Sequence, residues 1–132
     1  MIVDTSVWID YFAGRDTWQV QLLVRELEAE QPVGLTDFIY TEILCGIRHE
    51  RDLHVIERQL LALDILRLEG LDDFRSAAQL YRAARRRGLT IRRTADCLIA
   101  VVCIRADRPL LHNDSDFDSL GDVSALEVVK RG

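Results

Sequence analysis

The sequence predicts an α/β fold, a single domain over residues 1–132 in which a parallel sheet of four or five strands lies between helices. Three observations lead to this prediction. Short apolar segments alternate with longer segments of helical periodicity. The segment 95–106 is apolar on nearly every side, as a buried helix would be. The chain has 132 residues, 48% of them hydrophobic, so it is long enough to bury a core and too apolar to stay disordered.

The first half of the chain begins with an apolar strand over residues 1–3. Thr5 or Ser6 can cap the helix that follows, whose apolar residues recur at helical spacing through Phe12. Gly14 then breaks this helix. The next elements predicted are a helix over 17–30, a strand over 33–36, a helix capped by Asp37, a helical segment over 52–63 and a strand over 65–68.

In the second half of the chain, the sequence predicts two helices and two strands. A long helix begins at Asp72 or Asp73 and ends near Arg87, before Gly88. Thr94 precedes the apolar helix, and strands over 109–112 and 126–129 complete the sheet. In such sheets, ligands bind at the carboxyl ends of the strands, near the point where the strand order reverses.

Composition excludes several classes of protein. A net charge of −5 argues against a protein that coats nucleic acid without specificity. The longest apolar run, 98–104, is too short to span a membrane, and no basic region precedes an apolar stretch at the N-terminus, so we expect no signal peptide. Three cysteines without C-x-x-C spacing form neither a zinc site nor a disulfide framework, and we expect them to be buried. We expect a soluble domain of the cytoplasm.

Basic residues concentrate between positions 82 and 93, with no acid among them: Arg82, Arg85, Arg86, Arg87, Arg92 and Arg93. Such a cluster can hold phosphate groups. Alternatively, these arginines interact with the dipole at the end of the long helix. Lys130 is the only lysine in the chain, so chemistry that requires a lysine must use it.

Five acids fall where a doubly wound sheet can gather them at one edge: Asp4 after the first strand, Glu42 in the helix after the second strand, Asp96 in the first turn of the apolar helix, and Asp114 and Asp116 after strand 109–112. Converging carboxylates repel one another unless a cation lies between them. Ligands that are all oxygen favour Mg²⁺ or Mn²⁺. Three hydroxyl residues can orient the acids or water molecules, namely Thr5, Ser6 and Thr94.

Each acid also has a purely structural interpretation. Asp114 and Asp116 lie in a sequence typical of turns, Asp4 can be a helix cap, and Asp96 can stabilise a helix start through the dipole. Glu42 is the hardest to explain in this way, because a lone carboxylate on an apolar helix face is costly.

Four segments, in order along the whole chain, resemble the motifs of a known family: residues 2–9 (IVDTSVWI), 41–46 (TEILCG), 94–100 (TADCLIA) and 111–117 (LHNDSDF). They resemble the four acidic motifs of the PIN-domain ribonucleases, and within these the VapC toxins of bacterial type II toxin–antitoxin pairs. One departure is Asn113, where the family often has an arginine.

The resemblance implies endonucleolytic cleavage of RNA that depends on Mg²⁺ or Mn²⁺ and inhibits translation and growth. It implies that Asp4 and Asp96 bind the metal directly, that Glu42 and Asp114 complete the site, and that Asp116 supports it. It also implies a cognate antitoxin that occupies the active site and often carries a DNA-binding part, and a homodimer. The resemblance favours the phosphate-binding interpretation for five arginines, which can hold the RNA backbone: Arg82, Arg85, Arg86, Arg92 and Arg93.

Two rival α/β enzymes fit less well. A response-regulator receiver needs two adjacent acids after the first strand and a lysine near the end of a later strand, whereas Asp4 stands alone. A haloacid-dehalogenase-like phosphatase needs a second Asp where Ser6 stands. Two alternatives remain open: a PIN nuclease outside a toxin pair, which acts in RNA processing or on DNA, and an inactive module that only binds a partner.

Overall fold

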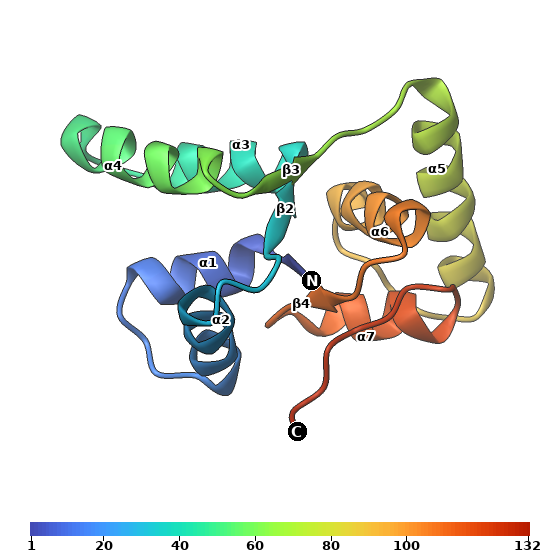
Figure 1. The fold of residues 1–132 in the computed structure, drawn as a ribbon. Coiled ribbons are helices and arrows are strands. Elements are labelled where there is room, and N and C mark those ends of the chain that lie inside the picture. Colours follow the sequence, from blue (N-terminus) through green and yellow to red (C-terminus); the bar gives the residue numbers. More distant parts are fainter.

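Four short strands form one parallel sheet in the computed structural model, which describes residues 1–132 (Figure 1). The strand order is β3-β2-β1-β4, with Ile2 opposite both Gly34 and Leu110. The chain runs outward from β1 to β3 and then returns to the other side of β1, so the order reverses between β1 and β4. The predicted parallel sheet is confirmed. Its strands are β1 (Ile2–Val3), β2 (Gly34–Thr36), β3 (Asp64–Leu66) and β4 (Leu110–Leu111).

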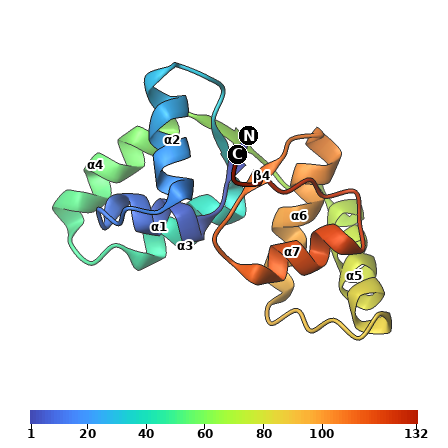
Figure 2. The same ribbon diagram turned by 90° about the horizontal axis from the view of Figure 1, so that it is seen from below.

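Seven helices flank this sheet: α1 (Thr5–Phe12), α2 (Trp18–Glu28), α3 (Asp37–Gly46), α4 (Glu50–Leu61), α5 (Leu71–Arg86), α6 (Thr94–Ala106) and α7 (Ser115–Asp122). Both views of the ribbon place α1 to α4 on one side of the strands and α5 to α7 on the other (Figures 1 and 2). Every helix falls short of the length and apolar character that a membrane span requires.

Helix α6 is buried, as its apolar composition predicts. Its side chains from Cys97 to Cys103 are buried except Leu98, which is partly exposed. Its last turn is held by Arg105, which donates to both oxygens of Asp73 in α5 at 3.2 and 2.9 Å. Because α6 is fixed in the core, its first turn is a rigid support for any side chain that points toward the sheet edge.

Helix α7 was not predicted, and the last predicted strand is wrong in extent. Asp114 caps α7, since its side chain accepts a hydrogen bond from the backbone N–H of Asp116. Residues with this chemistry favour turns and helix starts equally, so the sequence pattern did not separate the two. Of the strand expected over 126–129, only one bridge forms, between Leu110 and Val128, because β4 itself is only two residues long.

Two caps and one cysteine also differ from expectation. Of the candidate caps for α1 it is Asp4, and not Thr5 or Ser6, that caps the helix, and Thr36, rather than Asp37, caps α3. In both helices the residue that precedes the first turn has the extended backbone that a cap requires. Cys97 and Cys103 are buried, but Cys45, near the end of α3, is exposed.

Candidate metal centre

Asp4 lies at the carboxyl end of β1 and is only 2% exposed. Its Oδ2 accepts hydrogen bonds from the backbone N–H and the hydroxyl of Ser6, at 3.0 and 2.7 Å. The Ser6 hydroxyl in turn accepts from the backbone N–H of Asn113 at 2.9 Å, which ties the end of β1 to the end of β4. Oδ1 of Asp4 is buried and has no hydrogen-bond partner. Burial raises the pKa of Asp4, and the nearby charge of Glu42 raises it further.

Asp96 lies in the first turn of α6 and is fully buried. Its Oδ1 accepts a hydrogen bond from the Arg93 guanidinium at 2.8 Å, whereas its Oδ2 is buried without a partner. Burial raises the pKa of Asp96 to about 6, and the carboxylates of Asp114 and Asp4 add to this effect although Arg93 opposes it. Asp96 therefore ionises at higher pH than an ordinary aspartate, and a further cation beside it would favour its charged form.

Glu42 reaches the same edge of the sheet from α3. The Thr5 hydroxyl donates to its Oε1 at 2.8 Å, and Arg93 donates to its Oε2 at 3.0 Å. Because Arg93 contacts both Glu42 and Asp96, one guanidinium joins α3 to the start of α6.

Asp114 and Asp116 lie at the start of α7. Arg92 donates from its guanidinium to Oδ1 of Asp114 at 2.8 Å and to Oδ2 of Asp116 at 3.1 Å. The backbone N–H of Arg92 also donates to Asp116 at 3.1 Å. Carboxylate oxygens of Asp96, Asp114 and Asp116 all lie within 4.8 Å of one another. Asp4 is outside this group of three, but it is close enough to raise the pKa of Asp96.

The donor set fits a hard divalent cation. A buried carboxylate oxygen without a partner is costly, and this site contains two of them, Oδ1 of Asp4 and Oδ2 of Asp96. The other acids nearby also offer only oxygen, the ligand atom that Mg²⁺ and Mn²⁺ prefer. A divalent cation bound here would relieve the mutual repulsion of these carboxylates and would offer a partner to the oxygens that have none.

The remaining residues that the sequence predicts near the site differ in whether they contact the acids. Thr94 is exposed, and its hydroxyl forms no hydrogen bond to any of the acids. Arg92 and Arg93 form ion pairs with the acids and are part of the cluster. Three arginines lie instead along α5, exposed and without an acidic partner: Arg82, Arg85 and Arg86. The Arg85 guanidinium lies 5.7 Å from the centre of the Tyr81 ring.

One ion-pair group beside the site was missed by the sequence reasoning. Asp10 of α1 is buried and accepts from Arg15 at 2.8 Å and from the side chain of Asn113 at 3.1 Å. Asn113 also donates its backbone N–H to Ser6, so Asp10 helps to position the loop that orients Asp4. The signal that singled out Glu42, an acid inside a mostly apolar helix, applies equally to Asp10.

Carboxylates gathered where the strand order of a parallel α/β sheet reverses make this edge of the sheet a candidate divalent-cation centre. The sequence matches the family model of the PIN domain over residues 1–123. This chain belongs to the PIN domain family, and at 37% identity to two mycobacterial VapC ribonucleases it belongs within that family to the VapC proteins.

Ribonuclease VapC11 of Mycobacterium tuberculosis and the VapC ribonuclease Mb1587 of Mycobacterium bovis are each 37% identical to this chain over 131 residues. The match covers 97% of this chain and 96% of each relative. VapBC2 from Rickettsia felis, solved with a DNA fragment from its promoter, has a similar fold, with a TM-score of 0.75 at 15% identity over 97% of this chain and 96% of that one. FitAcB from Neisseria gonorrhoeae has a TM-score of 0.75 at 19% identity over 98% and 96% of the two chains.

Proposed function

We propose that this chain is the toxin of a type II toxin–antitoxin pair and acts in the cytoplasm as an endoribonuclease. It hydrolyses RNA phosphodiester bonds with Mg²⁺, or with Mn²⁺ in its place, and so inhibits translation and growth. The observation that carries the proposal is the pair of unpartnered, buried oxygens on Asp4 and Asp96 beside three further acids. The mycobacterial relatives at 37% identity, which are named as ribonucleases, support it.

In this proposal Asp4 and Asp96 hold the metal directly, and Glu42, Asp114 and Asp116 complete the acidic site. A divalent cation held by these residues would polarise the phosphoryl group and lower the pKa of water, so that hydroxide would be more available for attack at neutral pH. Ser6 keeps Oδ2 of Asp4 occupied, which leaves Oδ1 for the cation.

The arginines have a second role toward RNA. Arg92 and Arg93 border the cluster, are about half exposed or more, and can exchange part of their ion pairs for the phosphates of RNA. The exposed arginines of α5 (Arg82, Arg85 and Arg86) extend the basic surface along the RNA backbone.

A cognate antitoxin completes the proposed system. Several solved structures with a similar fold are toxin–antitoxin complexes, and one contains a promoter DNA fragment. We infer that an antitoxin covers the acidic site and that operator DNA is contacted only through the antitoxin. We also infer a homodimer of the toxin, for which the apolar residues of α3 and α4 are one candidate interface.

The test is cleavage of total bacterial RNA by the purified protein in Mg²⁺, in Mn²⁺ and in EDTA. The wild type is expected to cut with either metal and not with EDTA, and Asp96→Asn is expected to lose at least about a hundredfold in rate because it removes a proposed metal ligand. Asp107→Asn is the matched control, since it removes the same charge from the other end of α6 and is expected to retain activity.

No cutting with any metal by folded protein freed of antitoxin would overturn the proposal in favour of a module that only binds a partner. Equal cutting by the wild type and Asp96→Asn would show that the site is misplaced or the activity is a contaminant.

A further inference from the structure

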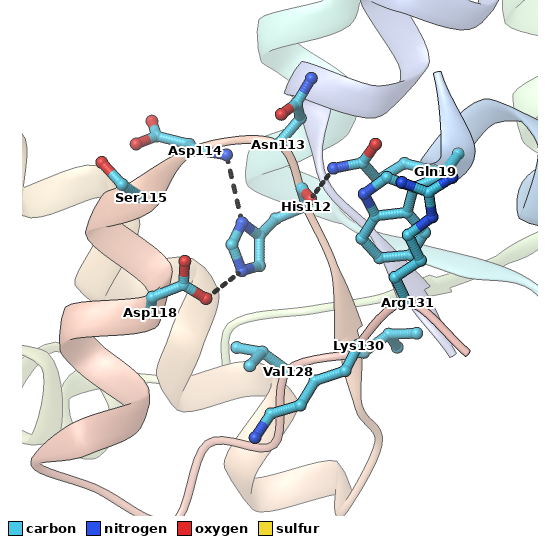
Figure 3. Close-up of a pocket in the computed structure, with 11 residues that line it drawn as sticks. Gln19, His112, Asn113, Asp114, Ser115, Asp118, Val128, Lys130 and Arg131 are labelled. Atoms are coloured by element: carbon cyan, nitrogen blue, oxygen red, sulfur yellow. Dashed lines mark hydrogen bonds and ion pairs between the residues drawn. The ribbon is translucent and has the colours of Figure 1, made fainter. Parts of the chain in front are cut away.

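A cavity of about 420 Å³ opens directly beside the acidic cluster, with Asp114 in its lining (Figure 3). One wall is formed by the end of β4 and the start of α7, where His112, Asp114 and Asp118 lie. A second wall comes from the start of α2, with Trp18 and Gln19, and a third from the C-terminal segment. The volume is within the range of small-molecule sites. Asp114 belongs to both the cavity and the carboxylate cluster, so a group bound in the cavity adjoins the site of hydrolysis.

The C-terminal wall carries two free positive charges. Lys130 and Arg131 line the cavity, are exposed, and form no ion pair with any acid of the chain. On the facing wall, Asp118 already contacts Nε2 of His112 at 3.1 Å. Two unpaired cations close to a phosphodiester-cleaving site are suited to bind a phosphate group of the same substrate.

The other walls offer an aromatic face and free hydrogen-bonding atoms. Trp18 is partly exposed at the cavity, whereas the other tryptophan, Trp8, is only 2% exposed and donates its indole N–H to the backbone of Val3. Gln19 is fixed through its amide N–H, which donates to the carbonyl of His112 at 3.2 Å, so its side-chain oxygen remains available to accept. The hydroxyl of Ser115 is also without a protein partner.

We propose that this cavity is a nucleotide subsite for the RNA substrate, next to the phosphate that is hydrolysed. A base stacks on Trp18, Arg131 and Lys130 contact phosphates of the RNA backbone beside it, and Gln19 and Ser115 contact the polar edge of the base or the ribose hydroxyls. This inference rests on the proposed ribonuclease function and adds the surface that holds the nucleotide beside the cut. A peptide segment of the antitoxin is the other conceivable occupant, but two unpaired cations and a tryptophan beside a phosphodiester-cleaving site favour a nucleotide.

Tryptophan fluorescence tests the subsite without any catalysis. A short mixed-sequence single-stranded RNA, titrated in EDTA, is expected to quench the emission of Trp18, because Trp8 is buried and does not respond. The quenching should disappear in Trp18→Phe, which keeps an aromatic ring in place, while RNA binding measured by anisotropy should remain. Trp18→Leu is expected to weaken binding about tenfold through loss of stacking.

Charge variants at the exposed C-terminal wall provide a second test that does not endanger the fold. The double variant Lys130→Gln/Arg131→Gln is expected to weaken RNA binding and to reduce the slope of log affinity against log salt by about 0.7 for each phosphate that the variant no longer neutralises. It should raise KM more than it lowers kcat, because these cations hold substrate rather than reacting atoms. The matched control, Arg51→Gln/Arg58→Gln, removes the same charge from exposed positions of α4 and should change neither slope nor KM.

The subsite and the ribonuclease function are overturned by different results. If the protein cuts RNA with metal but Trp18 does not respond and the C-terminal double variant binds RNA like the wild type, the subsite is overturned and the ribonuclease function stands. If RNA quenches Trp18 and the double variant weakens binding while no metal supports cutting, the nucleotide subsite stands and the ribonuclease function is overturned.

Discussion

Asp4 and Asp96 each have two carboxylate oxygens with different surroundings. One oxygen of each is held by the protein, through Ser6 or Arg93, and the other is buried without a partner. The held oxygen fixes the orientation of the carboxylate, and the free oxygen carries the cost of burial. This arrangement is unfavourable for stability alone, and it is what a cation-binding carboxylate requires.

The pKa of Asp96 gives a prediction for stability. Its value of about 6 in the folded chain exceeds the ordinary 3.8, so the folded state holds the proton more tightly than the unfolded state. The protonated Asp96 therefore stabilises the folded state fully below pH 3.8, and this stabilisation is lost as the pH rises through about 6. In EDTA at neutral pH, Asp96→Asn should therefore raise the Tm by several degrees and remove this part of the pH dependence. Thermal melts of both proteins across this pH range measure the effect.

Asp107→Asn should keep the pH dependence of the wild type in the same melts, since Asp107 is exposed at the other end of α6. A Tm of Asp96→Asn that is unchanged or lower at neutral pH would contradict the assignment of Asp96 as a destabilising, buried carboxylate.

The acids of the site could be predicted from sequence because each stands where an acid is out of place or follows a strand. Glu42 and Asp96 interrupt apolar helices, and Asp4 and Asp114 follow strands. The partners of these acids could not be predicted in the same way. Thr5 orients an acid, as predicted, but its particular partner Glu42 is 37 residues away in the sequence, and local spacing carries no information on such a contact.

Among the elements, β2 depends on the absence of a side chain at Gly34. A Cβ there would lie 2.9 Å from the backbone oxygen of Asp64 in β3 and 3.2 Å from the side chain of Ile2 in β1. The two neighbouring strands therefore approach β2 more closely than any other residue allows.

Gly34→Ala should destabilise the protein by about 1–3 kcal/mol, because it forces β2 away from its neighbours. Gly46→Ala is the matched control: no atom lies within 4 Å of its added methyl group, and Gly46 ends α3, so alanine should be neutral or stabilise by about 0.5 kcal/mol. Urea denaturation of both variants checks the pair. Equal stability of the two would contradict the close approach at β2.

The elements that periodicity predicts well are those with a long apolar stripe or a fully apolar surface, such as α2 and α6. Two elements at the end of the chain were not predicted correctly. The start of α7 consists of Asp and Ser residues that favour turns and caps equally, and residues 126–129 have the composition of a strand but only a two-residue neighbour to pair with.

Across the whole molecule, the net charge is −5, but acidic and basic side chains are concentrated in separate regions. Exposed arginines lie along α5, and Lys130 and Arg131 line a cavity together with Asp114 of the carboxylate cluster. The order of the motifs along the chain predicted the fold and the acids together. The sequence did not show that the arginines of residues 82–93 form two groups with different surroundings. Only the fold shows that Arg92 and Arg93 pair with the acids of the site, whereas Arg82, Arg85 and Arg86 lie on α5.

The central claim is that Asp4 and Asp96 hold a divalent cation, and calorimetric titration with Mn²⁺ tests it most directly. The wild type and Asp107→Asn should bind Mn²⁺ with equal affinity, and below about pH 6 binding should release a proton as Asp96 ionises. Asp4→Asn and Asp96→Asn, each folded by circular dichroism, should bind at least about tenfold more weakly. Equal affinity in all four proteins, or no binding by the wild type, would contradict the account.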